Sequence, residues 1–385
     1  MKRVCILIGT RPEAIKMAPV ILSLRKYASH FDVTVCATGQ HTTMLFDALN
    51  SFGIHPDVQF DTMKDGQSLA QLSSRIMTEL DEYINSSVPN LIMVHGDTTS
   101  ALVGGLVGFY HQIDVGHVEA GLRSNDLFSP FPEEFNRRSV AISAKYNFAP
   151  TKIARENLIQ EGCAVKSIVV TGNTVIDALL ITKRKLEKNE EVRRLVKNDL
   201  SSLLNFDAEK HSFILVTAHR RENLGKGIED ICRSLMHLAL KNPSFYFVYP
   251  LHLNPRVKDV VRYRLGKIKN IVLIPPQGYL NFTWLLCNCY LVLTDSGGIQ
   301  EEAPALGKPV LVMRDTSERP EAIHAGTAKL VTSHADNIIE ETQKLIDNEA
   351  GYQLMANAVN PFGDGKAGDI IANHLVEKNK DPGLV

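Results

Sequence analysis

Several features that would assign a chain to a particular class are missing from this sequence. No apolar run approaches the roughly 18 residues that a membrane-spanning helix needs, so we expect no membrane span. Neither sign of charge is in excess, because 42 basic and 43 acidic side chains give a net charge of −1, which excludes a general attraction to nucleic acid or to an anionic membrane. The six cysteines form no paired CxxC motifs, so we expect free thiols, no metal site and a cytoplasmic location.

Cofactor-binding signatures are also scarce. The sequence has no Walker A pattern. Its one match to a dinucleotide-binding pattern, Gly363 to Gly368, follows no predicted strand and leaves too little chain for a βαβ unit. We therefore expect no nicotinamide and no other cofactor.

What the sequence does contain is a regular alternation of short β-branched runs and helical patterns, which is typical of parallel α/β sheets. At 385 residues, the chain is too long for one ordinary core. A stretch dominated by Lys, Arg and Glu divides the runs into two series, so we predict two Rossmann-like doubly wound domains facing across a cleft. The predicted strands are Arg3–Ile8, Val33–Ala37, Leu91–His95, Val115–Val118 and Ile168–Thr171 in the first series, and Phe213–Thr217, Phe245–Tyr249, Ile271–Ile274, Leu291–Thr294 and Pro309–Val312 in the second.

The predicted boundaries follow from the charged stretch. Residues 1–175 form the first domain, residues 176–210 a charged connector with no core face of its own, and residues 211–365 the second domain. The sequence by itself does not decide which domain the last helix, at about 366–385, packs against.

Two carboxylates follow neighbouring predicted strands of the first domain. Asp97 comes after the strand 91–95 and either caps the next helix or acts chemically. Glu119 comes after the next strand, so we expect both side chains at one mouth, with His95 and His117 nearby. Such a grouping favours acid–base chemistry.

Two loops of the same domain combine charges with proline. Arg11 and Lys16 follow the first strand, where Pro12 opens a helix, and they either bind an anion or form a surface pair of charges. Glu133 and Arg137 lie four residues apart at the end of a proline-stiffened loop. They either form an exposed pair on one helix face or hold a polar substrate.

The second domain contains two candidate phosphate sites. His219 lies between a strand end and the arginines Arg220 and Arg221, an arrangement that suits a leaving phosphate, although a structural histidine is the alternative. The run Ser296-Gly297-Gly298 follows a buried strand and offers free backbone N–H groups to a diphosphate. Glu302 can accept hydrogen bonds from ribose hydroxyls, and Arg314 and Arg319 follow the next strand, so we predict a nucleotide-diphosphate site.

Together, these motifs resemble those of the non-hydrolysing UDP-N-acetylglucosamine 2-epimerases along nearly the whole chain. The resemblance rests on Gly9–Lys16, Val94–Thr99, Gly116–Arg123, Ser129–Arg137, His219–Asn223, Tyr249–Pro255, Leu293–Pro304 and Arg314–Pro320. It implies a fold similar to the GT-B glycosyltransferases, in which the last helix crosses back onto the first domain, and a homodimer. It also implies interconversion of UDP-N-acetylglucosamine and UDP-N-acetylmannosamine, a precursor of surface polysaccharide.

The resemblance further implies roles for individual residues. The implied catalytic set is Asp97, Glu119, Glu133, Arg137 and His219. The implied substrate contacts are Arg11, Lys16, Asp97, Glu119, His219, Gln277, Phe282, Ser296, Gly297, Gly298, Glu302 and Arg319. A second UDP-N-acetylglucosamine, acting as an allosteric activator, is implied at Gln40, Glu133, Arg220 and His252, although Thr43 and Gly66 depart from the glutamine and arginine of some members.

The chemistry can be argued from the substrate. The C2 proton of the sugar has no neighbouring carbonyl, and without NAD none can form, so a bare carbanion is too costly. We expect a carboxylate to remove this proton as UDP leaves C1, with His219 and the arginines stabilising the diphosphate. The alternatives are a hydrolysing 2-epimerase that releases N-acetylmannosamine and UDP, a GT-B glycosyltransferase, and a catalytically silent nucleotide-sugar sensor.

Overall fold

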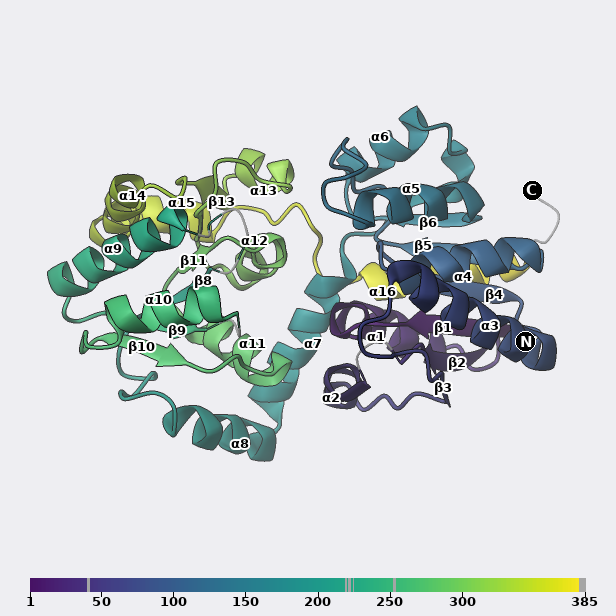
Figure 1. The fold of residues 1–385 in the computed structure, drawn as a ribbon, viewed down its shortest axis with the longest axis horizontal. Helices are drawn as coiled ribbons and strands as arrows, with labels where there is room; N and C mark the ends of the chain where they lie inside the picture. The colour runs from purple at the N-terminus through teal and green to yellow at the C-terminus, as the bar shows by residue number, and fades with distance from the viewer. Residues whose placement is uncertain (40–41, 219, 221–222, 224, 252–253, 381–385) are drawn as a thin grey trace. The chain divides into compact units, whose positions relative to one another are not determined.

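The chain divides into two compact units, each of which has its own sheet. Unit 1 comprises residues 1–180 and 362–385, and unit 2 comprises residues 181–361. The computed structural model describes residues 1–39, 42–218, 220, 223, 225–251 and 254–380. Both sheets are parallel and flanked by helices, which confirms the predicted α/β, Rossmann-like class (Figure 1).

Unit 1 contains a seven-stranded sheet in the order β3-β2-β1-β4-β5-β6-β7. Its strands are β1 (Lys2–Ile8), β2 (Phe31–Ala37), β3 (Val58–Gln59), β4 (Leu91–His95), β5 (Asp114–Val118), β6 (Tyr146–Ala149) and β7 (Ile168–Val170). Its helices are α1 (Arg11–Arg25), α2 (Thr42–Ser51), α3 (Leu69–Ser87), α4 (Thr99–Tyr110), α5 (Glu133–Ser143), α6 (Lys152–Gln160) and α16 (Ala367–Lys380), and α7 (Thr174–Lys188) begins in it. The strand order reverses between β1 and β4, so ligands are expected beyond the carboxyl ends of these two strands.

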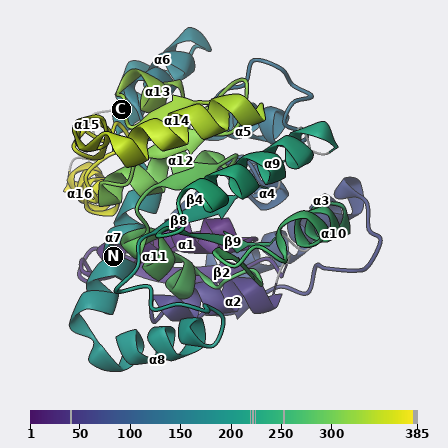
Figure 2. The same cartoon turned by 90° about the vertical axis from the view of Figure 1, so that its left-hand side faces the viewer.

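Unit 2 repeats this plan with six strands in the order β10-β9-β8-β11-β12-β13. Its strands are β8 (Phe213–Thr217), β9 (Tyr246–Pro250), β10 (Ile271–Ile274), β11 (Val292–Thr294), β12 (Val310–Val312) and β13 (Ala328–Leu330). Its helices are α8 (Glu190–Ser201), α9 (Lys226–Lys241), α10 (Pro255–Leu265), α11 (Tyr279–Asn288), α12 (Gly297–Glu302), α13 (Pro320–His324), α14 (Ala335–Asp347) and α15 (Glu349–Ala356). Helices α9 and α14 pack side by side (Figure 2). The strand order of this sheet reverses between β8 and β11.

The last helix, α16, packs against α1 in unit 1. Asp369 of α16 accepts hydrogen bonds from the Ser23 hydroxyl at 2.7 Å and the Lys26 ammonium at 2.8 Å. The Gly368 N–H donates to Asp177 of α7 at 2.8 Å. The chain therefore returns to its first unit after completing the second.

The charged stretch 176–210 differs from the expected connector, because it has an apolar face. Leu186, Val196 and Leu200 are buried, and α8 packs against α11 within unit 2. Apart from the buried Asp177, the charges of α7 and α8 are exposed or half-buried, so counting charge along the sequence hid an amphipathic pattern.

Among the described helices, none has the length and apolar character needed to cross a membrane. All six cysteines are free thiols.

Candidate active site

The loop after β1 is held by a buried carboxylate. Glu13 closes a capping box at the start of α1, and one of its oxygens accepts hydrogen bonds from the N–H groups of Gly9 at 3.0 Å and Thr10 at 2.8 Å. Its other oxygen accepts a hydrogen bond from the Thr98 hydroxyl at 2.7 Å, which joins this loop to the loop after β4. Burial raises the pKa of Glu13 to about 7, although the four hydrogen bonds to its carboxylate oppose that change.

Glu119 lies at the centre of the charged residues in unit 1. It directly follows β5 with a left-handed backbone φ of 63°, which is uncommon for a residue with a side chain. Its carboxylate is ion-paired with Lys16 of α1 and accepts a hydrogen bond from the Asn173 amide at 2.7 Å. Nε2 of His95, at the end of β4, lies 3.8 Å from the same carboxylate. The ends of β1, β4, β5 and β7 therefore contribute to one site.

The two histidines of this region differ in their surroundings. Burial lowers the pKa of His95 to about 4, so it is neutral at physiological pH beside Glu119. Burial also lowers the pKa of His117 to about 3, and its Nε2 lies 2.7 Å from the backbone oxygen of Gly96. His117 therefore supports the turn after β4 and holds the loop that precedes Asp97.

Asp97 does not cap α4, contrary to one of the two sequence interpretations. Thr98 is the cap, because its hydroxyl accepts the hydrogen bond from the Ala101 N–H at 3.1 Å. The Asp97 carboxylate instead pairs with Arg137 of α5, and its backbone oxygen accepts from the Asn136 amide at 2.8 Å. Burial raises the pKa of Asp97, and the Arg137 guanidinium opposes that change.

The ion pair between Glu133 and Arg137, one of the two sequence interpretations, does not form. Arg137 contacts Asp97, and it lies 3.6 Å from Glu134, the residue that follows Glu133 in α5. Oε2 of Glu133 is buried and has no hydrogen-bond partner among the described residues. The charges of Glu119 and Glu133 both disfavour ionisation of Asp97, which shows that the three carboxylates are close together.

In unit 2, arginine side chains surround the start of α12. Glu318 lies 3.4 Å from both Arg220 and Arg314, and although its burial opposes the change, the neighbouring arginines lower its pKa. Arg319 pairs with the buried Glu301 of α12. A Cβ on Gly297, the first residue of α12, would lie 3.6 Å from the Arg220 guanidinium. The half-buried Ser296 and Gly298 complete this terminus.

A buried aspartate orders the loop after β8 against the one after β11. One oxygen of Asp295 accepts hydrogen bonds from the Arg220 N–H at 2.8 Å and the Asn223 amide at 3.1 Å. Asp295 is fully buried between the two loops. The switch point of the second sheet therefore holds Arg220 next to the N-terminus of α12.

The remaining expected contacts of unit 2 lie near α11. Glu302 is buried and interacts with Tyr279 of α11; burial and this carboxylate both raise the pKa of Tyr279. Gln277 precedes α11 and donates to the Pro275 oxygen at 2.8 Å, and the half-buried Phe282 lies in the first turn of α11.

Some of the expected site residues lie outside the described part of the chain, and two residues of the site were not expected. Arg11 is exposed at the first position of α1, one turn from Lys16. His219, Gln40 and His252 lie outside the described residues. Sequence reasoning missed Glu13 and Asn173; the only sequence signal for Asn173 was its position shortly after a strand end.

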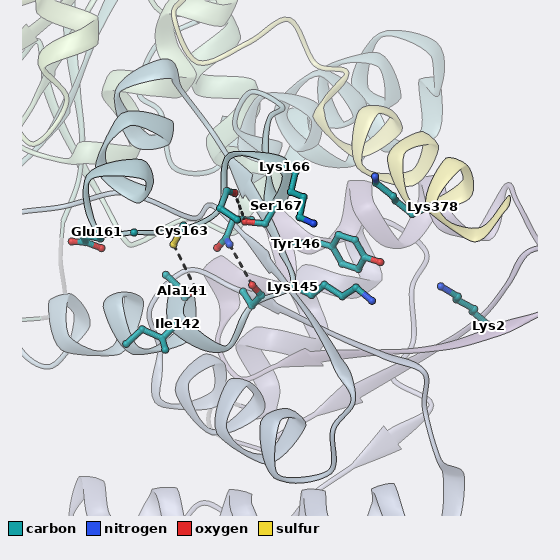
Figure 3. A pocket seen from close by; sticks show the side chains of 14 residues that line it. Lys2, Ala141, Ile142, Lys145, Tyr146, Glu161, Cys163, Lys166, Ser167 and Lys378 are labelled. Atoms are coloured by element: carbon teal, nitrogen blue, oxygen red, sulfur yellow. Dashed lines mark hydrogen bonds between the residues drawn. The ribbon is translucent and has the colours of Figure 1, made fainter. Parts of the chain in front are cut away.

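A cavity of about 510 Å³ in unit 1 lies away from these groups. Its lining includes Lys2 and Tyr146, which begin β1 and β6, and Lys378 of α16 (Figure 3). It is therefore at the amino ends of the strands, whereas the carboxylates and arginines described above follow carboxyl ends. The cavity plays no part in the candidate active site.

The fold and these sites define a class of protein. Each unit has a parallel sheet. Carboxylates follow the strands of unit 1, and arginines surround a helix terminus that follows a strand of unit 2. This arrangement is that of an α/β enzyme of the GT-B-like class. The family model for UDP-N-acetylglucosamine 2-epimerase matches residues 23–376. The chain belongs to the UDP-N-acetylglucosamine 2-epimerase family, and it is accordingly an isomerase.

Named relatives are similar over nearly the full length. The UDP-N-acetylglucosamine 2-epimerase of Escherichia coli (strain K12) is 48% identical over 95% of this chain and 96% of its own length. The corresponding enzyme of Campylobacter jejuni is 45% identical over 99% of both chains. The crystal structure of UDP-GlcNAc 2-epimerase from Neisseria meningitidis, bound to UDP-GlcNAc, superposes with a TM-score of 0.89 at 46% identity, covering 97% of this chain and 100% of that one.

Proposed function

We propose that this chain interconverts UDP-N-acetylglucosamine and UDP-N-acetylmannosamine by eliminating and re-adding UDP. The observation that carries the proposal is the Glu119 carboxylate, held by Lys16 and Asn173 beside a second carboxylate, Asp97, that is paired with Arg137. Two carboxylates in different electrostatic surroundings suit a reaction that removes a proton from one face of a carbon and returns one to the other.

The proposed reaction balances without an external oxidant or reductant. A carboxylate takes the C2 proton, the C1–C2 double bond forms, and the C1–O bond to UDP breaks, which leaves 2-acetamidoglucal and UDP. In the reverse step, UDP oxygen re-adds to C1 while C2 receives a proton on the opposite face. Asp97, Glu119, Glu133, Arg137 and His219 are the proposed catalytic set; which carboxylate serves which face stays open.

Unit 2 is proposed to hold the departing UDP. Ser296, Gly297 and Gly298 present the N-terminus of α12, and Arg319 adds a guanidinium that can stabilise the diphosphate charge. Glu302 is proposed to accept hydrogen bonds from ribose, and Gln277 and Phe282 are proposed to contact the base. Arg11 and Lys16 complete the proposed substrate contacts from unit 1.

The product distinguishes this proposal from its rivals. Purified enzyme incubated with UDP-N-acetylglucosamine, followed by ³¹P and ¹H NMR, should approach an equilibrium mixture with UDP-N-acetylmannosamine. Accumulation of UDP with free N-acetylmannosamine would instead indicate a hydrolysing 2-epimerase. Binding without any turnover would indicate a nucleotide-sugar sensor, and turnover only with an added sugar acceptor a glycosyltransferase.

A second molecule of UDP-N-acetylglucosamine is proposed to act as an activator. The proposed contacts are Gln40, Glu133, Arg220 and His252. Support comes from Glu133, whose buried Oε2 has no hydrogen-bond partner among the described residues and can receive a ligand hydroxyl. Initial rates with UDP-N-acetylmannosamine alone should be sigmoidal or show a lag that added UDP-N-acetylglucosamine removes; hyperbolic rates would refute an activator requirement.

A homodimer in the cytoplasm completes the proposal. Large apolar side chains are exposed on the neighbouring helices α4 and α5, where Phe109, Tyr110, Phe135 and Ile142 are 65, 64, 52 and 87% exposed. A second copy covering this face would bury them. Sedimentation should give a dimer mass that Ile142→Glu reduces to a monomer, and the six free thiols fit a reducing compartment.

A further inference from the structure

Asn173, the residue that precedes α7, donates a hydrogen bond to Glu119, but the proposed reaction gives it no role of its own. We propose that Asn173 is a positioning residue: its side chain fixes the Glu119 carboxylate, and its own backbone is fixed by the segment through which the chain returns to unit 1. The inference rests on the proposed function, because only that function gives Glu119 a chemical role.

The hydrogen bonds of Asn173 determine which way its amide faces. The side chain is buried, and its Oδ1 accepts from the Val175 N–H at 3.1 Å. Its Nδ2 must therefore face Glu119, to which it donates at 2.7 Å. A donor at this place favours the ionised carboxylate, which is the form that a base needs.

Glu119 needs such a partner more than an ordinary surface carboxylate does. The ammonium of Lys16, with which it is ion-paired, stands at the end of a long side chain with four rotatable bonds, which fixes position poorly. An asparagine has only two side-chain torsions, and both of its amide atoms are engaged here. Asn173 therefore sets the direction of the carboxylate, and Lys16 supplies charge.

The backbone of Asn173 is held by the returning chain. Its N–H donates to the Phe362 oxygen at 2.7 Å, and Phe362 is the first residue of unit 1 after the return from unit 2. Gly172 and Gly363 both have positive φ, and their backbones are in contact. A Cβ on Gly363 would lie 3.2 Å from Gly172 Cα. A side chain at either position would be closer than an ordinary van der Waals contact, so the two segments pack tightly against each other.

The first test is Asn173→Ala, with Asn147→Ala as the matched control. Asn147 is an equally buried asparagine of unit 1, on β6, whose amide donates to the Ala144 oxygen at 3.5 Å rather than to Glu119. Asn173→Ala should lower kcat about tenfold to a hundredfold, with KM changed by less than about twofold. Equal kcat in the two variants, at comparable thermal stability, would overturn the proposal.

A pH profile separates positioning from mere stability. Asn173→Asp keeps the shape but removes the donor and places a second carboxylate against Glu119, which faces Lys16, His95, Asp97 and His117. Repulsion between the carboxylates should move the acidic limb of the kcat profile to higher pH. A uniformly lower kcat with an unmoved limb would contradict the assignment.

The close packing of Gly172 against Gly363 is tested by Gly363→Ala, with Gly162→Ala as the control. Both glycines have positive φ, at 114° and 90°, but a Cβ on Gly162 meets no atom within 4 Å. The backbone penalty is therefore similar, and only Gly363→Ala should reduce kcat. If both variants keep wild-type kcat, the returning segment has no part in placing Glu119.

The outcomes keep the two proposals apart. If the wild-type enzyme forms no UDP-N-acetylmannosamine, the proposed function fails and this inference fails with it. If the wild type epimerises while the Asn173 and Gly363 variants retain its kcat and pH profile, the inference alone is wrong.

Discussion

Replacing Glu13 by Gln should remove a pH dependence of stability that the structure builds into unit 1. The pKa of Glu13 is raised from its ordinary 4.5 to about 7 by burial. The native state therefore retains a proton that the unfolded chain releases above pH 4.5, so stability from this group is present at low pH and lost as pH rises toward 7. The difference between 7 and 4.5, at about 1.4 kcal/mol per pKa unit, is on the order of 3 kcal/mol.

The assay is urea unfolding at about pH 5 and about pH 8. The sole tryptophan, Trp284, lies in unit 2, so a transition seen by circular dichroism but not by Trp284 fluorescence belongs to unit 1. Glutamine can donate to the Thr98 hydroxyl and accept from Gly9 and Thr10, so the fold is retained. The stability of Glu13→Gln relative to wild type should increase by on the order of 3 kcal/mol between these pH values. The control Glu82→Gln, at an exposed position, should leave the pH dependence of stability unchanged. Equal pH dependence in wild type and Glu13→Gln would refute the reasoning.

Two further predictions concern the arginines. Arg137→Met removes the cation that opposes the raised pKa of Asp97, so the acidic limb of kcat/KM against pH should move to higher pH; an unmoved limb would exclude Asp97 as the titrating group. Arg319→Gln removes a guanidinium from the α12 terminus and should weaken UDP binding by calorimetry about tenfold or more. The exposed Arg262→Gln serves as its control, and equal affinity in the two variants would remove Arg319 from the diphosphate site.

The architecture was predictable where strands are buried on both faces. The runs Leu91–His95, Phe213–Thr217 and Ile271–Ile274 coincide with β4, β8 and β10, because continuous apolar runs bounded by turn residues are typical of central parallel strands. Three strands were missed: β3 has two residues, β13 contains a lysine, and β6 contains Asn147. β3 and β13 are short edge strands, and Asn147 interrupts the apolar run of β6, which lies inside the sheet between β5 and β7. Such segments become strands through their neighbours, which local pattern does not reveal.

The site was predictable by position and less so by contact. Strand ends correctly brought Asp97 and Glu119 close together, because carboxyl ends of parallel strands share one edge. Asp97 as the partner of Arg137 was not predicted, since helical spacing suggests only Glu133, whereas the tertiary fold places Asp97 within reach. Asn173 depends on a contact between residues 54 positions apart, which no local spacing encodes.

Solvent hydrogen exchange at C2 tests the central claim most directly. Wild-type enzyme and UDP-N-acetylglucosamine in heavy water, followed by ¹H NMR, should lose the C2 proton signal of both epimers at a rate matching turnover, because the abstracted proton exchanges with solvent before its return. Glu119→Gln should abolish both exchange and epimerisation. Epimerisation with no deuterium at C2 would contradict proton abstraction by a carboxylate of this site.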